Sequence, residues 1–499
     1  NMQRFYLYLN MTKPGEKLIL SYSDTNAKGE GISPAYLIGS IRSLYPKLEI
    51  EGGGVRPHKN SINNYCYPEN PEAGIDLFLE KLAQETEKNH EDILEQADET
   101  DAVFRELYSW YLRNPEYRSR VEKLVQSAFA GKPKDIISQS VAKALYGEVS
   151  PYSATRLERF AACAFAHFLQ YGMKLTERVE YEFKPMDMGN VMHEALESFA
   201  EEVRKRGMKW TELTEQERNE IADRCLDNIV ADYGNTVLKS SARNEYMIER
   251  TRRILRRTVW ALQKQLEQGE FQPEGFEVTF GGGRIDRVDI MEDQNKVYVK
   301  VIDYKTGNTS FDLVYLYHGL QLQLMIYLDG ALRVEQKKYP DKEIIPAGVF
   351  YYNIKDPMIQ EKIDADVEAV SAGLMKELKM NGLVQADPEL VYRMDSSLGS
   401  IPVAFNKDGS FRKNSSVADR TQFAVLGRYV RTKIEKIRSS ILEGDAEVSP
   451  YELGKKNACT YCPYMTVCGF DRRLSGYEFR RLKNFSDEEL WKAFDREAE

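Results

Sequence analysis

Two runs of β-prone residues, 283–290 and 296–305, are separated by a short polar segment, and this arrangement predicts a β-hairpin. Because side chains alternate between the two faces of a strand, one face of the second run carries, in order, Val297, Val299, Val301, Asp303 and Lys305. Pairing of the two runs brings Asp286 to within about one or two residues of Asp303 along the sheet. The sequence therefore predicts a strand pair that ends in two carboxylates and one ammonium group.

Two carboxylates held this close repel each other unless a cation lies between them. A divalent metal would supply that charge, and ligands that are all oxygen atoms favour magnesium or manganese. An exposed ion pair between Asp303 and Lys305 explains the same spacing equally well. Other polar residues favour the metal: His193 lies near the start of a predicted helix, and Gln323 and Tyr327 share one face of another.

The remaining pattern predicts an α/β fold. Strands are expected at 276–280, 284–291, 296–304 and 347–354, and helices at 153–169, 189–207, 319–332, 367–380 and 418–442. Residues 1–60 have a β-rich pattern, whereas 71–145 are rich in helix-forming residues. A segment with glycine and proline around Pro151 marks the first domain boundary, and a length of 499 residues fits two or three domains.

Composition excludes several classes of protein. The net charge is −9, so a positive field over the whole molecule for nucleic acid is excluded. The longest uncharged apolar run, 160–173, is too short to cross a bilayer. Six cysteines are too few for a disulfide scaffold, so we expect a reducing, cytoplasmic environment in which cysteines bind metal.

Three of the cysteines lie within ten residues of one another, at Cys459, Cys462 and Cys468. Structural zinc sites and iron–sulfur clusters both commonly take four cysteines, so a fourth ligand is expected. Cys66 lies in the other predicted domain and Cys225 resembles an ordinary buried helical cysteine. Cys163 is therefore the natural fourth ligand, and the spacing leaves zinc and iron both open.

One predicted helix carries a dense group of arginines: Arg250, Arg252, Arg253, Arg256 and Arg257. Such a group is usually a solvated surface. In an acidic chain that met DNA, however, Arg252, Arg253, Arg256 and Arg257 would be candidates for phosphate contacts.

The chain resembles nuclease domains of the RecB/AddB type, in the PD-(D/E)XK superfamily, through four motifs in the same order: Gly189-x-x-x-His193, Gly283-x-Ile285-Asp286-Arg287, Asp303-Tyr304-Lys305 and Gln323-x-x-x-Tyr327. The resemblance implies a restriction-endonuclease-like core at 151–480, with a central mixed sheet flanked by helices. The implied ligands of Mg²⁺ or Mn²⁺ are His193, Asp286, Asp303 and the backbone carbonyl of Tyr304. Lys305 would orient or deprotonate the attacking water, and Gln323 and Tyr327 would contact DNA or brace the site.

The cysteines resemble the [4Fe–4S] arrangement of the AddB family, in which one cysteine precedes the nuclease core and three follow it. Residues 153–163 are similar to the corresponding AddB segment, although Ala164 stands where a proline commonly follows the first cysteine. The resemblance implies a cluster on Cys163, Cys459, Cys462 and Cys468 that ties the two ends of the nuclease domain together.

Residues 7–22 are similar to the last signature motif of UvrD-like helicases, but Lys13 stands where an arginine is expected. The chain also has no GxxxxGK[ST] phosphate loop, so we expect no ATPase activity. The resemblance implies that residues 1–150 are the C-terminal remnant of an inactivated helicase region, incomplete and mainly helical. Residues 481–499 are expected to form a helical tail.

The family implies a cytoplasmic heterodimer with an AddA-type helicase–nuclease subunit. That complex processes double-strand DNA ends for recombinational repair, and this nuclease would hydrolyse the 5′-terminated strand as an exonuclease. A CRISPR-associated iron–sulfur exonuclease is disfavoured by the helicase-like residues 1–60. A non-catalytic DNA-binding scaffold is disfavoured by the intact Asp286, Asp303 and Lys305, and a zinc-stapled binding protein is a further alternative.

Overall fold

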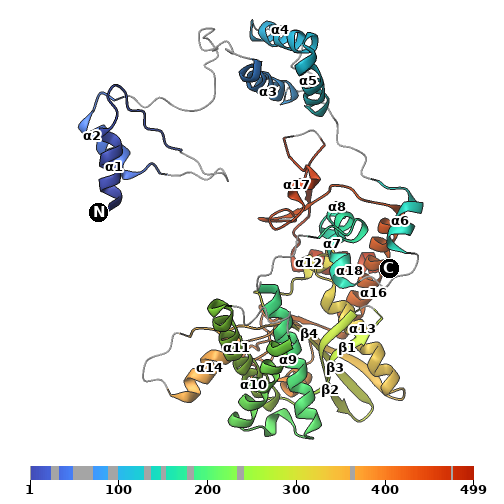
Figure 1. Ribbon diagram of the computed structural model, residues 1–499. Helices are drawn as coiled ribbons and strands as arrows, with labels where there is room; N and C mark the ends of the chain where they lie inside the picture. The colour runs from blue at the N-terminus through green and yellow to red at the C-terminus, as the bar shows by residue number, and fades with distance from the viewer. Residues whose placement is uncertain are drawn as a thin grey trace. The chain divides into compact units, whose positions relative to one another are not determined.

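The structure is a computed structural model that describes residues 2–23, 33–48, 71–87, 99–128, 136–147, 153–176, 185–232, 241–281, 283–359, 366–473 and 476–498. The chain forms two compact units, one of residues 1–85 and 90–121 and the other of residues 86–89 and 122–499 (Figure 1). The expected domain boundary at 150/151 falls at residues 148–152, outside the described residues, and stays a prediction.

The regular elements among the described residues up to 128 are helices: α1 Met2–Thr12, α2 Tyr36–Leu44, α3 Pro71–Glu87, α4 Glu99–Arg113 and α5 Pro115–Ala128. Helices α3 and α4 pack through aromatic rings, because Phe78 stacks on Phe104 and Tyr108 at centroid distances of 4.9 and 5.8 Å. The hydroxyl of Tyr111 donates to the carbonyl oxygen of Pro71 at 2.7 Å. These contacts fix α3 against α4 within the first unit.

The prediction of a β-rich start is wrong for the described residues. Residues 2–12 form a helix and residues 13–23 contain no strand, while residues 24–32 and 49–60 lie outside the described part. The short run Phe5–Leu9 is apolar at nearly every position, so its pattern fits a helix as well as a strand. In the structure Phe5 and Leu9 lie one helical turn apart on α1.

The second unit contains a six-stranded sheet in the order β1 Gln272–Phe280, β2 Gly283–Asp293, β3 Lys296–Lys305, β4 Glu343–Asn353, β5 Asn381–Gln385 and β6 Val417–Ala418. Strands β1 to β3 are antiparallel neighbours, β3 and β4 are parallel, β4 and β5 are antiparallel, and β5 and β6 are parallel. The predicted central mixed sheet and its first four strands are confirmed.

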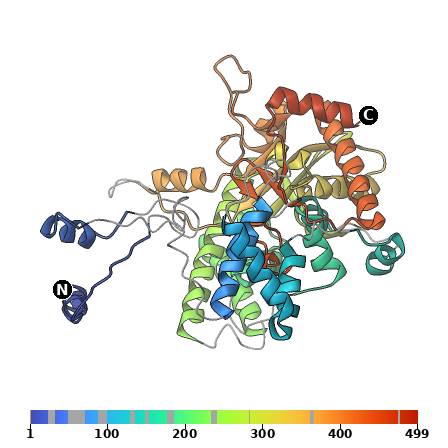
Figure 2. The same ribbon diagram turned by 90° about the horizontal axis from the view of Figure 1, so that it is seen from above.

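Helices cover both faces of this sheet, with the green α9, α10 and α11 on one side and α13 on the other (Figures 1 and 2). The first group is α9 Pro185–Lys205, α10 Glu215–Asp232 and α11 Ala242–Glu267, and the second is α7 Ala154–Ala162, α13 Gln323–Lys338, α16 Arg420–Glu443 and α18 Asp487–Ala498. Strand β3 contributes Tyr298 and Ile302 to the first apolar core and Val299 and Val301 to the second. The alternation expected for this strand is confirmed.

Three predicted helices have different bounds in the structure. Helix α9 begins at Pro185 rather than near 189, because a proline is well tolerated in the first turn of a helix. The predicted helix 153–169 is broken at Cys163, whose backbone is extended with φ −165°. It continues as α8 Ala164–His167 and the π-helix η3 Phe168–Gly172. The helix predicted near 319–332 is present as α13, but it begins at Gln323 and ends at Lys338. The helices predicted near 367–380 and 418–442 are confirmed as α14 Val367–Glu377 and α16.

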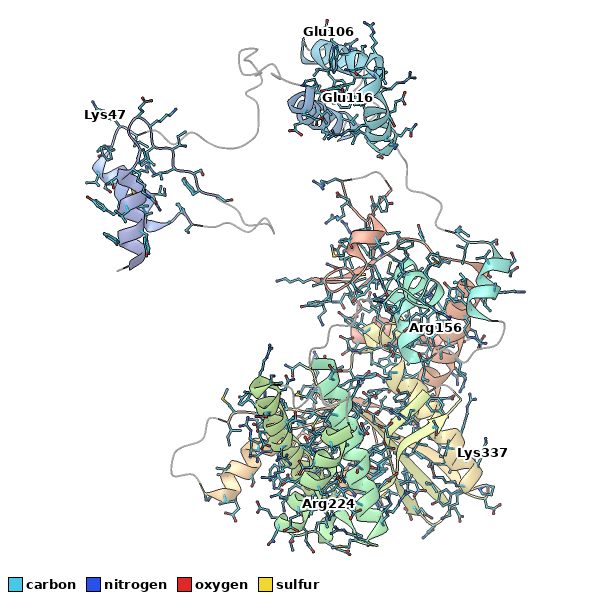
Figure 3. The ribbon with its side chains drawn as sticks, viewed as in Figure 1. Lys47, Glu106, Glu116, Arg156, Arg224 and Lys337 are labelled. Carbon is cyan, nitrogen blue, oxygen red and sulfur yellow. The ribbon has the colours of Figure 1, made fainter. Side chains whose placement is uncertain are left out.

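Side chains between α6 (Gln139–Tyr146), α7 and η3 hold this region of the second unit together. Arg156, labelled in Figure 3, donates from Nε to Nε2 of His167 at 3.2 Å. Its guanidinium also lies over the rings of Tyr146 and Tyr171, at 5.2 and 5.3 Å from their centroids. Arg156 therefore joins α7 to the two neighbouring helical segments.

The remaining elements of the second unit are short: α6 Gln139–Tyr146, η4 Trp210–Glu212, α12 Leu313–Tyr317, α15 Pro388–Met394, β7 Tyr451–Leu453, β8 Lys456–Asn457, α17 Met465–Cys468 and β9 Arg480–Arg481. Strands β7, β8 and β9 form a small separate sheet around the cysteine-rich segment. Of the helices in the described residues, none combines the length and apolar character needed to span a membrane.

Candidate active site

The hairpin of β2 and β3 places the two predicted carboxylates side by side. Arg287 of β2 pairs with Ile302 of β3, so the residue before Arg287, Asp286, lies beside Asp303. The backbone N–H of Tyr304 donates to Oδ2 of Asp286 at 2.7 Å, which ties the Asp286 side chain to β3. The spacing expected from the sequence is confirmed.

Lys305 connects this pair of carboxylates to helix α13. Its Nζ lies 2.6 Å from Oδ2 of Asp303 and donates to Oε1 of Gln323 at 2.8 Å. The amide nitrogen of Gln323 donates in turn to the hydroxyl of Tyr327 at 2.9 Å. Residues from β2, β3 and α13 that are far apart in the sequence therefore form one hydrogen-bonded chain.

Burial and nearby charge change the protonation of this site. Burial raises the pKa of Asp303 to about 7, the charge of Asp286 adds to the rise, and the ammonium of Lys305 opposes it. Burial also raises the pKa of Tyr327 to about 12, so its hydroxyl is neutral at physiological pH. A cation bound at Asp303 would displace a proton, because metal ligands must be deprotonated.

His193 reaches the carboxylates from α9. Its Nδ1 lies 3.3 Å from Oδ2 of Asp286. Burial lowers the pKa of His193, but the hydrogen bond and negative charge of Asp286 outweigh burial, so the pKa is raised overall. The imidazole is therefore held against Asp286 by both charge and hydrogen bonding.

Glu277 belongs to the same group, although the sequence motifs did not indicate it. Its Oε1 lies 4.0 Å from Nδ1 of His193, and its other oxygen forms an ion pair with Nε of Arg284. Burial and the charge of Asp286 raise the pKa of Glu277 to about 7. A predicted pairing of β1 with β2 could have identified Glu277 from the sequence. Phe276 pairs with Arg287, and this pairing places Glu277 across from Asp286.

These residues fit a divalent cation. His193, Glu277 and Asp286 each offer one ligand atom, and the three atoms lie within 4.8 Å of one another. Asp303 is beside Asp286, although its carboxylate is paired with Lys305. Carboxylate oxygens with one imidazole are suitable ligands for manganese, and carboxylates for magnesium.

Glu158 of α7 contacts the start of α13, the helix that carries Gln323 and Tyr327. It is a second residue of the site that the sequence motifs did not indicate. Oε1 of Glu158 accepts the backbone N–H of Leu322 at 2.7 Å and that of Gln323 at 3.0 Å. Burial raises the pKa of Glu158 to about 7, and these two N–H groups and Lys305 oppose the rise. Glu158 thus caps the first turn of the helix that carries Gln323 and Tyr327.

The four expected cysteine ligands come together at the end of α7. Burial, followed by the nearby Cys163, Cys462 and Cys468, raises the pKa of Cys459 to about 12. Nη2 of Arg159 lies 3.9 Å from Sγ of Cys462. Cys225 is buried among the helices α9 to α11, whereas Cys66 lies outside the described residues.

Asp289, an acid close to Asp286 in sequence, belongs to the opposite face of the sheet. It pairs with Nε of Arg287 at 2.5 Å and with Nζ of Lys300 at 3.0 Å, and all three side chains are buried. Burial opposes ionisation of Asp289, but the two cations outweigh it and lower its pKa. Its charge is therefore satisfied within the protein core.

The predicted DNA-contacting arginines lie on α11, and most face acidic side chains. Arg252 lies 2.7 Å from Asp227, and Arg256 forms an ion pair with Asp223. Arg253 lies 2.6 Å from Asp356, and the guanidinium of Arg257 lies 5.3 Å from the centroid of the Trp260 ring. DNA contact by these arginines stays a prediction, and the acidic partners reduce the positive charge on which it depends.

Comparison with known proteins gives one family and one group of relatives. Residues 151–469 match the sequence profile of the PD-(D/E)XK nuclease superfamily. The B subunit of the ATP-dependent helicase/deoxyribonuclease of Lachnoclostridium phytofermentans is 39% identical over the whole chain, which covers 43% of that protein. Proteins of the same name from Alkaliphilus metalliredigens and Clostridium acetobutylicum are 32% and 31% identical over 100% and 99% of the chain, which spans 44% of each.

The chain thus spans less than half the length of the curated relatives it matches. The superfamily match, by contrast, includes α7, the whole six-stranded sheet and the three cysteines after α16. It covers more than half of the chain, together with the mixed sheet and the strand ends that carry the acidic residues. The chain belongs to the PD-(D/E)XK nuclease superfamily.

Proposed function

We propose that this chain is a metal-dependent deoxyribonuclease whose reaction takes place beside Asp286, Asp303 and Lys305. The observation that carries this proposal is the ammonium of Lys305, 2.6 Å from the carboxylate of Asp303 and next to Asp286 at one end of the sheet. Metal-assisted phosphodiester hydrolysis needs carboxylates that bind a metal ion and a positive charge that stabilises the phosphate. Asp286 and Asp303 supply the carboxylates, and Lys305 supplies the positive charge.

Each residue has a proposed role. The cation ligands are His193, Asp286, Asp303 and the backbone carbonyl of Tyr304. Bound Mg²⁺ or Mn²⁺ would polarise a phosphoryl oxygen and lower the pKa of a bound water. Lys305 would orient or deprotonate the attacking water and stabilise the charge that develops on the phosphate. Gln323 accepts a hydrogen bond from Lys305, and Tyr327 holds Gln323, so α13 keeps the ammonium directed toward Asp303.

We also propose that Cys163, Cys459, Cys462 and Cys468 hold a [4Fe–4S] cluster. The support is the proximity of Cys163, Cys462 and Cys468 to Cys459, together with the resemblance of their order in the sequence to the AddB family. Such a cluster would close a loop of nearly 300 residues and add about 5–6 kcal/mol of stability, if it behaves as a covalent cross-link does. An iron content near four per chain, with the broad visible absorption of a cluster, would support this assignment.

The names of the relatives extend the proposal to a complex. As part of a helicase/deoxyribonuclease, the chain would act in the cytoplasm with an AddA-type helicase–nuclease partner. The substrate would be single-stranded DNA delivered from double-strand ends, cut as an exonuclease on the 5′-terminated strand during recombinational repair. Residues 1–150 would be a helicase remnant without ATPase activity, 151–480 the nuclease domain and 481–499 a helical tail, in which α18 lies.

The test is cleavage of end-labelled single-stranded DNA by anaerobically purified protein with and without Mg²⁺. Wild type and the exposed control Glu292→Gln should cleave only with the metal, and Asp303→Asn should not cleave. Substrates labelled at either end report the polarity. Equal cleavage by Asp303→Asn would overturn the proposal, as would inactivity of the wild-type chain even when the AddA-type partner is added.

A further inference from the structure

Glu277 lies at an irregular point of β1. Its φ is +49°, in the left-handed region that residues other than glycine rarely adopt. The strand alternation changes there, because Phe276 packs in the core beside α9 while Val278 packs in the core beside α13. At this irregular point of the strand, the Glu277 side chain lies beside His193 and Asp286.

The two oxygens of Glu277 have different surroundings. One forms an ion pair with Nε of Arg284, a side chain that is 62% exposed. The other faces Nδ1 of His193 at 4.0 Å, within the group of three ligand atoms that also includes Asp286. The Glu277 side chain is only 6% exposed, so its second oxygen is directed inward at the candidate cation site and not into solvent.

We propose that Glu277 is a direct ligand of the divalent cation, on the side of Asp286 opposite to Asp303. This inference rests on the proposed nuclease function and adds a residue to its metal site. It would give the cation three carboxylates from three adjacent strands, β1, β2 and β3. Arg284 would hold the outer oxygen of Glu277 and leave the inner oxygen for the metal.

A structural role for Glu277 leads to different expectations. If Glu277 only neutralises Arg284, the double variant Glu277→Gln/Arg284→Gln keeps the net charge near the cation and should bind Mn²⁺ like wild type. If Glu277 is a ligand, the double variant should still bind Mn²⁺ more weakly than wild type, because it lacks one ligand oxygen of negative charge. The exposure of Arg284 makes its substitution safe for the fold.

The experiment measures Mn²⁺ binding to the full chain without DNA, from the electron paramagnetic resonance signal of free Mn²⁺. We expect Glu277→Gln to raise the Kd for Mn²⁺ at least about tenfold, a change typical of lost support at a metal site. Arg284→Gln should lower the Kd or leave it unchanged. Glu274→Gln is the matched control, because Glu274 is a carboxylate of the same strand that pairs with Lys338 away from the site.

The variant Asp286→Asn distinguishes a wrong assignment of Glu277 from a wrong assignment of the metal site as a whole. If Asp286→Asn abolishes binding and Glu277→Gln binds Mn²⁺ like wild type, the assignment of Glu277 is wrong and the nuclease site stands. If neither substitution changes binding, the metal site itself is wrong. The melting temperature of each variant without metal shows whether it is folded, and Glu277→Gln should not lower it, because the substitution relieves repulsion between Glu277 and Asp286.

Discussion

Glu158 provides a test of how the fold holds the reacting groups. Its carboxylate accepts two backbone N–H groups at the start of α13, from Leu322 and Gln323. Burial raises its pKa from the ordinary 4.5 to about 7 in spite of these bonds. The ionised form is therefore less favourable in the folded protein than in the unfolded chain.

The cost of this ionised form can be worked out from the pKa of Glu158. The difference between 4.5 and about 7 corresponds to about 3–4 kcal/mol, at about 1.4 kcal/mol for each pKa unit. Between these values the folded state binds a proton that the unfolded state has released, so stability falls as the pH rises. The contribution is fully present below about pH 4.5 and is lost as the pH passes through 7.

Two substitutions separate the charge from the hydrogen bonds. Glu158→Gln keeps an acceptor oxygen without the charge, so its stability relative to wild type should rise by up to about 3 kcal/mol between pH 5 and pH 8. Glu158→Ala leaves two N–H groups without this acceptor and should be less stable than Glu158→Gln by about 1–3 kcal/mol at every pH. Because Gln323 holds Lys305, Glu158→Ala should also lower kcat, and Glu158→Gln should largely restore it.

The assay is urea unfolding from pH 5 to pH 8, followed by tryptophan fluorescence, since three of the four tryptophans lie in the second unit: Trp210, Trp260 and Trp491. Glu335→Gln is the control. Glu335 is a buried carboxylate on α13, the helix that Glu158 caps, and it pairs with Lys338 away from the site. A difference between wild type and Glu158→Gln that does not change with pH would refute the reasoning.

Three further predictions concern the cysteines, Lys305 and Gln323. Cys163→Ala and Cys459→Ala should each lose iron and lower the melting temperature, while Cys225→Ala should keep its iron, as iron analysis and calorimetry would show. Lys305→Ala should lower kcat by a factor of about 100 or more while Mn²⁺ binding persists, because Lys305 acts on water and phosphate and is not a ligand. Gln323→Ala should lower kcat more than it raises KM in steady-state cleavage, and an equal rise in KM would instead indicate DNA contact.

The sequence predicted the site best where local periodicity decides the structure. Valines at alternate positions of 296–305 indicated a strand, and the same alternation placed Asp303 and Lys305 on its α13 side. A short polar connection then fixed the register that brings Asp286 beside Asp303. Each of these steps depends on residues fewer than twenty positions apart.

The residues that sequence reasoning missed depend on contacts or backbone conformations that periodicity does not encode. Glu158 meets Leu322 across 164 positions, and no pattern within α7 indicates that its partner is the start of another helix. Glu277 meets Asp286 through the pairing of β1 with β2, which periodicity within either strand does not indicate. The break at Cys163 is of the same kind, since the apolar spacing of residues 157–169 favours one continuous helix.

Helix α7 connects the cysteine segment to the reaction site, although no cysteine belongs to that site. Helix α7 is short, and Glu158 and Cys163 are five positions apart, about 7 Å along its axis. Glu158 caps α13, and the first residue of α13, Gln323, holds the ammonium of Lys305. A displacement of Cys163 would therefore move Glu158 and the first turn of α13, and with them the hydrogen bond to Lys305. A cluster on the four cysteines would restrain that displacement, so loss of iron should lower kcat even in molecules whose sheet remains folded.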